Sequence, residues 1–374
     1  MGLAKGAGRM ILHLYFARRF ALAFTYVLGG FLVLVILLDF IEQLRRFRGM
    51  EITLSQKAHL VALNVPATLY QMLPLVTVLC SIMLFLNLAR SSELVVTRAA
   101  GRSALRALYG PILTSLLIGL IAIAIINPIV AGTQKKYEQL LSSFFSSRVS
   151  AVSVSSTGLW LRQGDEQAQT VIHAKRSNLD GTRLFDVALY EFDLSGKATR
   201  RIAATTATLG DGYWNLINAK EWQLGLRGNP EAEADTKRQY KIPTELTKDH
   251  IQDSFGSPSS IPIWQLPAFI NQLEKAGFSA RRHRVWFHME MALPLFLTSI
   301  VMIGAGFTMR HGRQSRTGLR VLMTLLFGFG LYFLRNFAQI LGENGQLPEI
   351  WAAWIPPIAA IGLSLAFLLH TEDG

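Results

Sequence analysis

The sequence predicts an α-helical polytopic membrane protein with six transmembrane helices and an antiparallel β insert, a sandwich or a jelly roll, between the third and fourth helix. Of its 374 residues, 51% are hydrophobic and only 17% are charged, whereas soluble domains carry about 25% charged residues. Six nearly uncharged stretches approach or exceed the ~20 residues that a helix needs to cross a bilayer. Between the third and the fourth stretch the sequence turns polar and alternates with period two, as strands do. This composition excludes disorder, coiled coil and collagen, and the single cysteine, Cys80, excludes a disulfide scaffold.

The predicted spans form two groups of three. They cover residues 20–38, 58–89, 107–134, 291–309, 321–341 and 350–369. The first is not expected to be a cleavable signal peptide, because its apolar part is long and no A-x-A site follows. The fifth contains Arg335, so it spans the membrane only if this side chain lies near an interface or faces protein.

The polar segment from about residue 135 to 284 predicts a separate β domain. Residues 170–173 and 187–192 alternate as strands do, and three dipeptides typical of hairpin turns separate such runs: Asp180-Gly181, Ser195-Gly196 and Asp211-Gly212. After this domain, residues 262–277 are expected to form an amphipathic helix that leads back to the membrane. Its apolar positions are Trp264, Leu266, Phe269, Ile270 and Leu273.

Basic residues in short loops predict the orientation, because such loops are enriched in Lys and Arg on the cytoplasmic side. The N-terminal segment and the loops after spans two and four lie on one side of the membrane. They carry twelve basic residues, more than the opposite side: Lys5, Arg9, Arg18, Arg19, Arg90, Arg98, Arg102, Arg106, Arg310, Arg313, Arg316 and Arg320. Both termini are therefore expected in the cytoplasm, and the β domain outside it.

A second group of basic residues runs against this trend, at the outer ends of spans. It follows span one, follows span three and precedes span four: Arg45, Arg46, Arg48, Lys135, Lys136, Arg281, Arg282 and Arg284. At one depth these cations would form a collar for a polyanionic lipid headgroup, because Arg binds phosphate bidentately. Alternatively, they snorkel to or pair with ordinary lipid phosphates.

Asp39 is the one carboxylate expected within a span. It follows nineteen uncharged residues, or about 28 Å of helix. A residue at that depth usually has a partner, and Arg335 is the candidate by depth. We interpret the two as a pair that latches a lateral opening, within the chain or across to a partner subunit; alternatively, Asp39 is simply interfacial. The scarcity of such carboxylates weighs against a proton-coupled carrier.

No pattern of residues indicates catalysis. The motifs G-x-x-x-x-G-K-[ST], G-x-S-x-G and H-E-x-x-H are absent, and the spacing of His283, His288 and Glu290 is not a zinc signature. The chain is therefore expected not to be an enzyme and to bind no metal or cofactor of its own. Energy must then come from a partner or a gradient.

The cytoplasmic segment 90–102 has the features of a short amphipathic helix. Ser91 can cap it, Glu93 lies near its positive end and Gly101 stops it. A permease offers such a helix to a cytosolic ATPase, and the residues expected to make this contact are Arg90, Glu93, Leu94, Val95 and Arg98. Alternatively, the helix lies on the lipid surface.

The chain thus divides into three parts. Residues 1–134 form the first transmembrane half, with an N-terminal interfacial helix and the cytoplasmic helix at about 90–102. Residues 135–260 form the β domain, and residues 261–374 form the amphipathic connector and the second transmembrane half.

Several of these segments resemble the permeases of the lipopolysaccharide export ABC transporter, the LptF/LptG family, and its LptG members most. The resemblance covers essentially the whole chain. It is carried by residues 15–19 (YFARR), 39–46 (DFIEQLRR), 91–101 (SSELVVTRAAG), 158–160 (GLW) and 266–277. The Ser-Glu-Leu segment and the layout of three spans, β insert and three spans are its specific parts.

The resemblance implies a fold of six transmembrane helices with a periplasmic antiparallel β-jellyroll between helices three and four. It implies a multi-pass permease subunit of the bacterial inner membrane that extracts lipopolysaccharide. It implies a heterodimer with an LptF-like sister permease on a dimeric, LptB-like cytosolic ATPase, which binds ATP and Mg²⁺. The lipid would pass to a single-span, LptC-like periplasmic jellyroll protein and a soluble LptA-like bridge; no nucleic acid is involved. Arg45 and Arg46 match family positions that contact lipid A phosphates. At Asp39 and Arg335 the family carries the opposite charges, which favours the latch interpretation.

The acyl chains of the lipid are expected in an apolar cavity below the collar. Its predicted lining residues are Phe31, Leu34, Phe327, Phe329, Leu331 and Phe333. Each methylene that moves into such a cavity contributes ~0.8 kcal/mol. Two alternatives stay open: a mechanotransmission ABC permease that drives periplasmic partners without moving lipid, and a membrane-anchored β-domain adaptor or enzyme.

Overall fold

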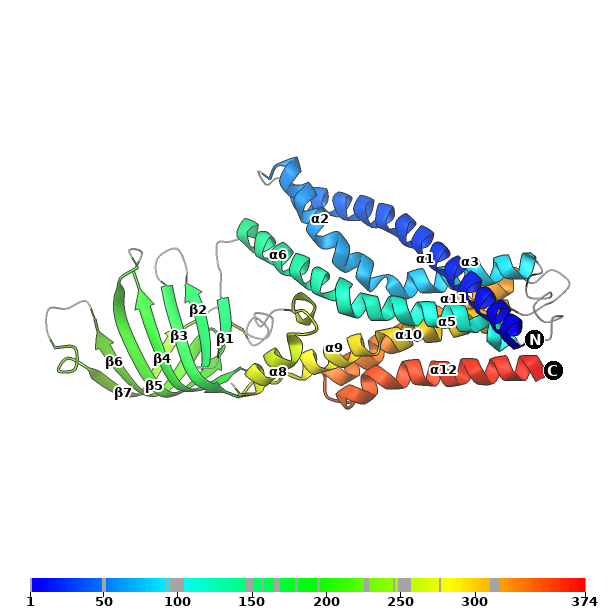
Figure 1. The fold of residues 1–374 in the computed structure, drawn as a ribbon. Helices are drawn as coiled ribbons and strands as arrows, with labels where there is room; N and C mark the ends of the chain where they lie inside the picture. The colour runs from blue at the N-terminus through cyan, green and yellow to red at the C-terminus, as the bar shows by residue number, and fades with distance from the viewer. Residues whose placement is uncertain are drawn as a thin grey trace. The chain divides into compact units, whose positions relative to one another are not determined.

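The structure, a computed structural model, describes most of the chain: residues 2–48, 52–91, 93, 104–145, 151–155, 158–164, 169–178, 181–193, 196–224, 229–244, 246–247, 257–275, 277–309 and 317–373. The chain forms two compact units (Figure 1). Unit 1 comprises Met1–Gln134 and Arg284–Gly374, and unit 2 comprises Lys135–His283. The connector expected with the second transmembrane half is thus grouped with the β insert.

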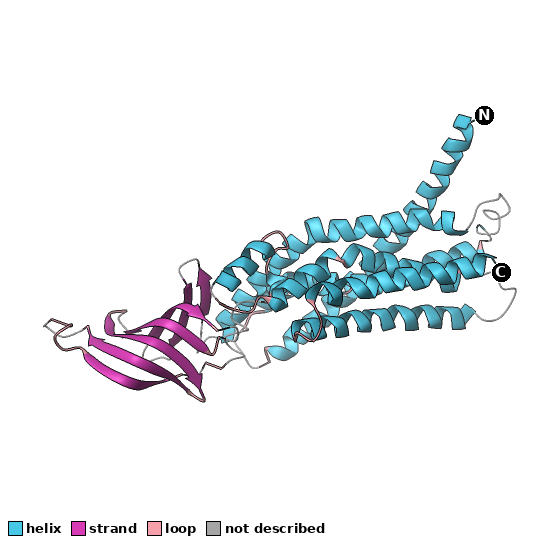
Figure 2. Cartoon of the chain, turned by 90° about the horizontal axis from the view of Figure 1, so that it is seen from below, coloured by secondary structure: helices cyan, strands magenta, loops and turns pink. Residues whose placement is uncertain are grey.

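Unit 1 is helical (Figures 1 and 2). Its helices, two of which (α6 and α9) continue into unit 2, are α1 (Gly2–Arg46), α2 (Leu54–Gln71), α3 (Leu73–Arg90), α5 (Ala104–Ile121), the π-helical turn η1 (Ala122–Ile126), α6 (Asn127–Phe145), α9 (Arg281–Met291), α10 (Leu293–Thr308), α11 (Thr317–Glu343) and α12 (Glu349–Asp373). Within the described ranges, five helices are long and apolar enough to cross a membrane. A sixth span results if α9 and α10, bent by 50°, count as one. The prediction of a helical membrane protein is confirmed.

Two helix breaks in unit 1 are each followed by a Leu-Pro pair. The break between α2 and α3 lies at Met72, and that between α9 and α10 at Ala292. Pro74 and Pro294 lie in the first turn of the following helix, where the missing N–H is harmless, whereas a continuous helix would place the ring against a carbonyl one turn earlier. The stretch predicted as a span at 58–89 is therefore divided between α2 and α3.

α10 lies at the centre of unit 1, and most of its residues are buried. It packs against α3, α5, α11 and α12. A Cβ atom on Gly119 of α5 would lie 2.5 Å from Pro294 Cα, and one on Gly304 would lie 2.7 Å from Ser81 Cβ. Helices α5 and α3 therefore approach α10 closely only because these positions are glycine.

In its described residues, unit 2 is built on one seven-stranded antiparallel sheet (Figure 1). Its strands are β1 (Ala151–Ser155), β2 (Gly158–Gly164), β3 (Gln169–Ser177), β4 (Arg183–Phe192), β5 (Ala198–Gly210), β6 (Tyr213–Gln223) and β7 (Asp235–Pro243). The strands follow one another as hairpins in the order β1 to β7. The antiparallel β insert is confirmed, but this order is a meander and not the strand exchange between two sheets of a jelly roll.

Glycines with positive φ make the tight turns of this meander. Gly181, Gly196 and Gly212 have φ angles of 75°, 80° and 79°, which glycine adopts without a steric penalty. The predicted strands at 170–173 and 187–192 lie within β3 and β4. Alternate side chains of these strands are buried, Ile172 and Ala174 in β3 and Val187 and Leu189 in β4, so one face of the sheet carries the core.

The predicted amphipathic helix is α8 (Leu266–Lys275). Leu266, Ile270 and Leu273 are buried, as the 3.6-residue period requires. Trp264 precedes the helix and is 63% exposed, so its prediction as one of the apolar helix positions was wrong.

Candidate functional site

A buried carboxylate lies where three helical segments of unit 1 meet. The side chain of Glu290, at the end of α9, is 2% exposed. Its Oε2 atom accepts a short hydrogen bond from the Tyr70 hydroxyl of α2. The same atom accepts a second hydrogen bond, of 3.2 Å, from Asn127 Nδ2 at the start of α6. Buried carboxylates in membrane helices are costly and usually serve a function, so this cluster is a candidate site.

Irregular backbone places each member of the cluster. Tyr70 and Glu290 lie four residues before Pro74 and Pro294, so each precedes a helix break. Asn127 follows the π-helical turn η1, and its backbone N–H bonds the carbonyl of Ala122. Because a π turn shifts every later side chain around the helix axis, it sets the direction of Asn127. Such turns occur often at functional sites.

The cluster borders a cavity of about 130 Å³. The cavity is lined by Tyr70, Gln71, Pro74, Trp286, Glu290, Leu293, Tyr332, Arg335, Asn336 and Gln339. The Arg335 guanidinium lies 5.2 Å from the centre of the Phe296 ring and interacts electrostatically with Glu290. Within the described residues, no ion pair of 4.0 Å or less joins the two groups. The expectation that Asp39 is the one carboxylate within a span was wrong, because Glu290 is buried as well.

Asp39 has surroundings of its own. Its Oδ1 atom accepts hydrogen bonds of 2.9 Å from Asn64 Nδ2 of α2 and 3.5 Å from Gln43 Nε2 of α1. In the described part of the chain, no ion pair joins Asp39 to Arg335. A lateral latch between these positions therefore requires a second subunit.

The residues of the predicted cation collar are exposed. Arg45 and Arg46 end α1 and Arg48 follows it; Lys135 and Lys136 lie in α6, and Arg281 and Arg282 begin α9. Arg45 and Arg46 also suit the negative end of the α1 helix dipole. Arg284 makes a 3.4 Å ion pair with Glu349. The collar residues belong to both units. That they lie together at one depth of the membrane therefore stays a prediction.

The predicted apolar lining does not form one cavity within this chain. Phe327 and Leu331 line a cavity of about 800 Å³ between α10, α11 and α12. Phe329 lines a separate cavity of about 150 Å³. Leu34 and Phe333 are 46% and 66% exposed, so they face outward, and Phe31 is half-buried. A common cavity for these side chains would need a partner surface.

Part of the predicted ATPase contact is described. Arg90 ends α3, whereas Leu94, Val95 and Arg98 lie outside the described residues. Glu93 Oε1 forms a 2.9 Å ion pair with Arg19 Nη1 of α1. The Arg19 guanidinium in turn lies 4.8 Å from the centre of the Tyr15 ring. This contact links the predicted coupling segment to the first helix.

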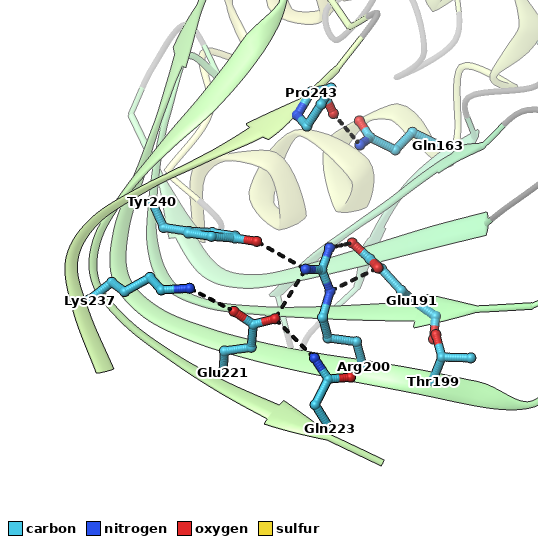
Figure 3. Close-up of polar contacts among 9 residues, drawn as sticks. All are labelled: Gln163, Glu191, Thr199, Arg200, Glu221, Gln223, Lys237, Tyr240 and Pro243. Atoms are coloured by element: carbon cyan, nitrogen blue, oxygen red, sulfur yellow. Dashed lines mark hydrogen bonds and ion pairs between the residues drawn. The ribbon is translucent and has the colours of Figure 1, made fainter. Parts of the chain in front are cut away.

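The β domain contains a charged cluster that the sequence analysis missed (Figure 3). Arg200 and Glu191 are register partners in β5 and β4 and form hydrogen bonds of 2.5 and 2.9 Å. Arg200 also donates to Glu221 at 3.1 Å and to the Tyr240 hydroxyl at 2.9 Å. The hydrogen bonds to Glu191 raise the pKa of Arg200 above its ordinary value. The cluster therefore holds four neighbouring strands together through a fixed charge.

A family model and individual relatives of known function both match this chain over most of its length. The family model described as "Lipopolysaccharide export system permease LptF/LptG" matches residues 14–370. A lipopolysaccharide export system permease protein LptG from Haemophilus influenzae is 22% identical over 351 residues, which cover 90% of this chain and 92% of that protein. The protein of the same name from Escherichia coli K12 is 22% identical over 354 residues, or 93% of this chain and 95% of that protein.

Proposed function

Because the chain belongs to the lipopolysaccharide export system permease LptF/LptG family, we propose that it forms one transmembrane half of a transporter that extracts lipopolysaccharide from the outer leaflet of the inner membrane. The lipid then passes to periplasmic jellyroll bridge proteins. As a family member the chain is a transport subunit. In this proposal a separate cytosolic ATPase binds ATP and Mg²⁺ and hydrolyses the nucleotide.

The observation that carries this proposal is the uncovered apolar surface of α1. In the most apolar 18-residue stretch of α1, only 17% of the residues are buried. In the most apolar 18-residue stretch of α11, 22% of the residues are buried. A helix that is apolar on all sides needs lipid or another protein around it. A sister permease placed against α1 and α11 would enclose a space with one wall from each chain. Acyl chains can be accommodated there at little cost, because the wall replaces the lipid environment.

The basic residues at the end of α1 suit the other end of such a lipid. Arg45, Arg46 and Arg48 are exposed at one helix terminus, and guanidinium groups bind phosphate oxygens in pairs. Lys135, Lys136, Arg281 and Arg282 complete this collar in the proposal. Phosphates held at the collar would place the acyl chains along the apolar faces of α1 and α11.

The energy for extraction enters through the segment after α3 in this scheme. The ATPase dimer contacts the segment 90–102, and closure of the ATPase narrows the space between the permeases. The ion pair between Arg19 and Glu93 supports this route, because it joins the segment to α1 directly. Movement of the segment would therefore reach the wall that holds the lipid. Both termini are cytoplasmic and the β domain is periplasmic in this arrangement.

Reconstitution tests the proposal. The chain is placed with an LptF-like permease and an LptB-like ATPase in vesicles that contain lipopolysaccharide, and a soluble LptA-like acceptor is added outside. ATP should transfer lipopolysaccharide to the acceptor, and a hydrolysis-deficient ATPase should not. ATP hydrolysis that leaves all lipopolysaccharide in the bilayer would reject export and favour a mechanotransmission permease.

A further inference from the structure

The cavity beside Glu290 combines both signs of charge in a small space. It measures about 130 Å³. Glu290 and Arg335 both line it, and in the described structure neither has an ion-pair partner within 4.0 Å. Both hydrogen bonds to Glu290 arrive at Oε2, so Oε1 remains available to a group in the cavity. The site thus offers one anionic and one cationic contact.

A third polar group in the cavity wall has no hydrogen-bond partner among the residues that the structure describes. The indole nitrogen of Trp286 is buried and makes no hydrogen bond with any described residue. Trp286 lines the same cavity as Arg335. Buried indole N–H groups usually find an acceptor. Trp286 and Arg335 together form a donor pair suited to an anionic oxygen, on the same cavity as the carboxylate.

The polar cavity lies next to an apolar one. A second cavity, of about 150 Å³, shares Gln71, Pro74 and Tyr332 with the first. Its other lining residues are Met72, Leu75, Val78, Gly328 and Phe329. Because these residues are apolar, the second cavity suits a hydrocarbon chain. The break between α2 and α3 at Met72 lies in its wall, so the same Leu-Pro pair shapes both cavities.

From this arrangement we propose that the chain holds a bilayer phospholipid with an ethanolamine headgroup. The phosphate accepts hydrogen bonds from Arg335 and the Trp286 indole, and the primary ammonium donates to Glu290 Oε1. The first part of an acyl chain lies along Val78 and Phe329. This lipid differs from the exported substrate, because its site lies within one permease, between α2, α3, α9 and α11.

The chemistry of the site favours ethanolamine over other common headgroups. A phosphatidylglycerol headgroup carries no cation and would leave Glu290 beside a second anion. A choline headgroup carries a cation, but its three methyl groups replace the N–H donors that a carboxylate accepts, and they enlarge the headgroup. Of these three headgroups, ethanolamine alone supplies an anion, a small cation and hydrogen-bond donors.

Native mass spectrometry of the purified permease complex tests this proposal. The complex is exchanged into nanodiscs that contain equal amounts of phosphatidylethanolamine, phosphatidylcholine and phosphatidylglycerol, and the lipids retained on this chain are counted after release. We expect at least fivefold more phosphatidylethanolamine than either other lipid. Equal retention, a preference for phosphatidylglycerol, or no retained lipid would overturn the proposal.

Substitutions in the cavity test whether the preference for phosphatidylethanolamine arises at this site. Glu290→Gln keeps the side-chain volume and can still accept from Tyr70, and it should bring the preference for phosphatidylethanolamine over phosphatidylglycerol close to one. Arg335→Gln should lower retention of both lipids at least fivefold. Glu42→Gln, which neutralises an exposed carboxylate of α1, is the matched control and should retain the wild-type preference. An unchanged preference in Glu290→Gln would place the lipid elsewhere. Because the wild-type comparison needs no substitution, the proposal stays testable if a variant fails to assemble.

Discussion

Arg19 Nη1 lies 2.9 Å from Glu93 Oε1, so an ion pair joins the first helix to the segment that follows α3. Both side chains are partly exposed, at 39% and 27%, and exposed pairs contribute only about 0–1 kcal/mol to folding. The pair therefore matters less for stability than for the position of the Glu93 carboxylate. In the proposed transporter, this carboxylate faces the ATPase.

We expect Glu93→Ala to lower the amount of ATPase that copurifies with the permease pair, because it removes a charge from the proposed contact. Arg19→Ala should cause a smaller loss, since it removes the group that positions the carboxylate but leaves the carboxylate itself. Glu42→Ala, at the other end of α1, serves as the control and should behave as wild type. Normal recovery of the ATPase with Glu93→Ala would contradict a coupling role.

The basic end of α1 should hold the phosphates of the exported lipid. Changing Arg45 and Arg46 together to Glu should reduce photocrosslinking of lipopolysaccharide to the chain roughly tenfold or more, because one charge-assisted hydrogen bond contributes about 1.5–3 kcal/mol and 1.4 kcal/mol is a factor of ten. Arg18→Glu changes an exposed arginine at the far end of the same helix and is the control. Unchanged crosslinking in the double variant would remove these residues from the lipid site.

The spans and the β insert could be predicted because each depends on a local pattern. A long uncharged run needs no partner to be recognised as a membrane helix, and Gly181, Gly196 and Gly212 marked the hairpins from their type alone. The order of the strands was less predictable. A period of two shows which residues share a face, but the choice between a meander and a two-sheet jelly roll depends on long-range pairing.

The buried carboxylate was missed because uncharged stretches were taken as the spans. That criterion starts the fourth span at Met291 and so excludes Glu290. A usable signal was present, since both Tyr70 and Glu290 lie four residues before a proline that follows leucine. Such prolines break membrane helices, and polar side chains often gather where helices break. The contribution of Asn127 could not be predicted, because it depends on the π turn at Ala122–Ile126.

The separate surroundings of Asp39 and Arg335 predict how a charge swap will behave. Asp39→Lys should impair lipopolysaccharide export, because it removes the acceptor for Asn64 and reverses a charge at the proposed subunit boundary. Adding Arg335→Asp in the same chain should not restore export, since Arg335 lies beside Glu290. Export rates of reconstituted complexes provide the measurement. Export by the Asp39→Lys variant should be restored only by an acidic substitution in the fifth span of the sister permease. If the double variant Asp39→Lys with Arg335→Asp exports lipopolysaccharide normally, the pair forms within the chain.

Gly119 should be essential for the packing of α5 against the bend between α9 and α10. A Cβ atom at this position would lie 2.5 Å from Pro294 Cα, which is backbone and cannot rotate away. We expect Gly119→Ala to destabilise the protein by about 1–3 kcal/mol, as overpacking does, and to lower the midpoint of thermal unfolding in detergent. Gly132→Ala is the matched control, because a Cβ atom there meets no other atom within 4 Å, and alanine favours helix over glycine by about 1 kcal/mol. The two substitutions should therefore shift the midpoint in opposite directions, and a stabilising effect of Gly119→Ala would mean that α5 lies farther from Pro294 than the structure shows.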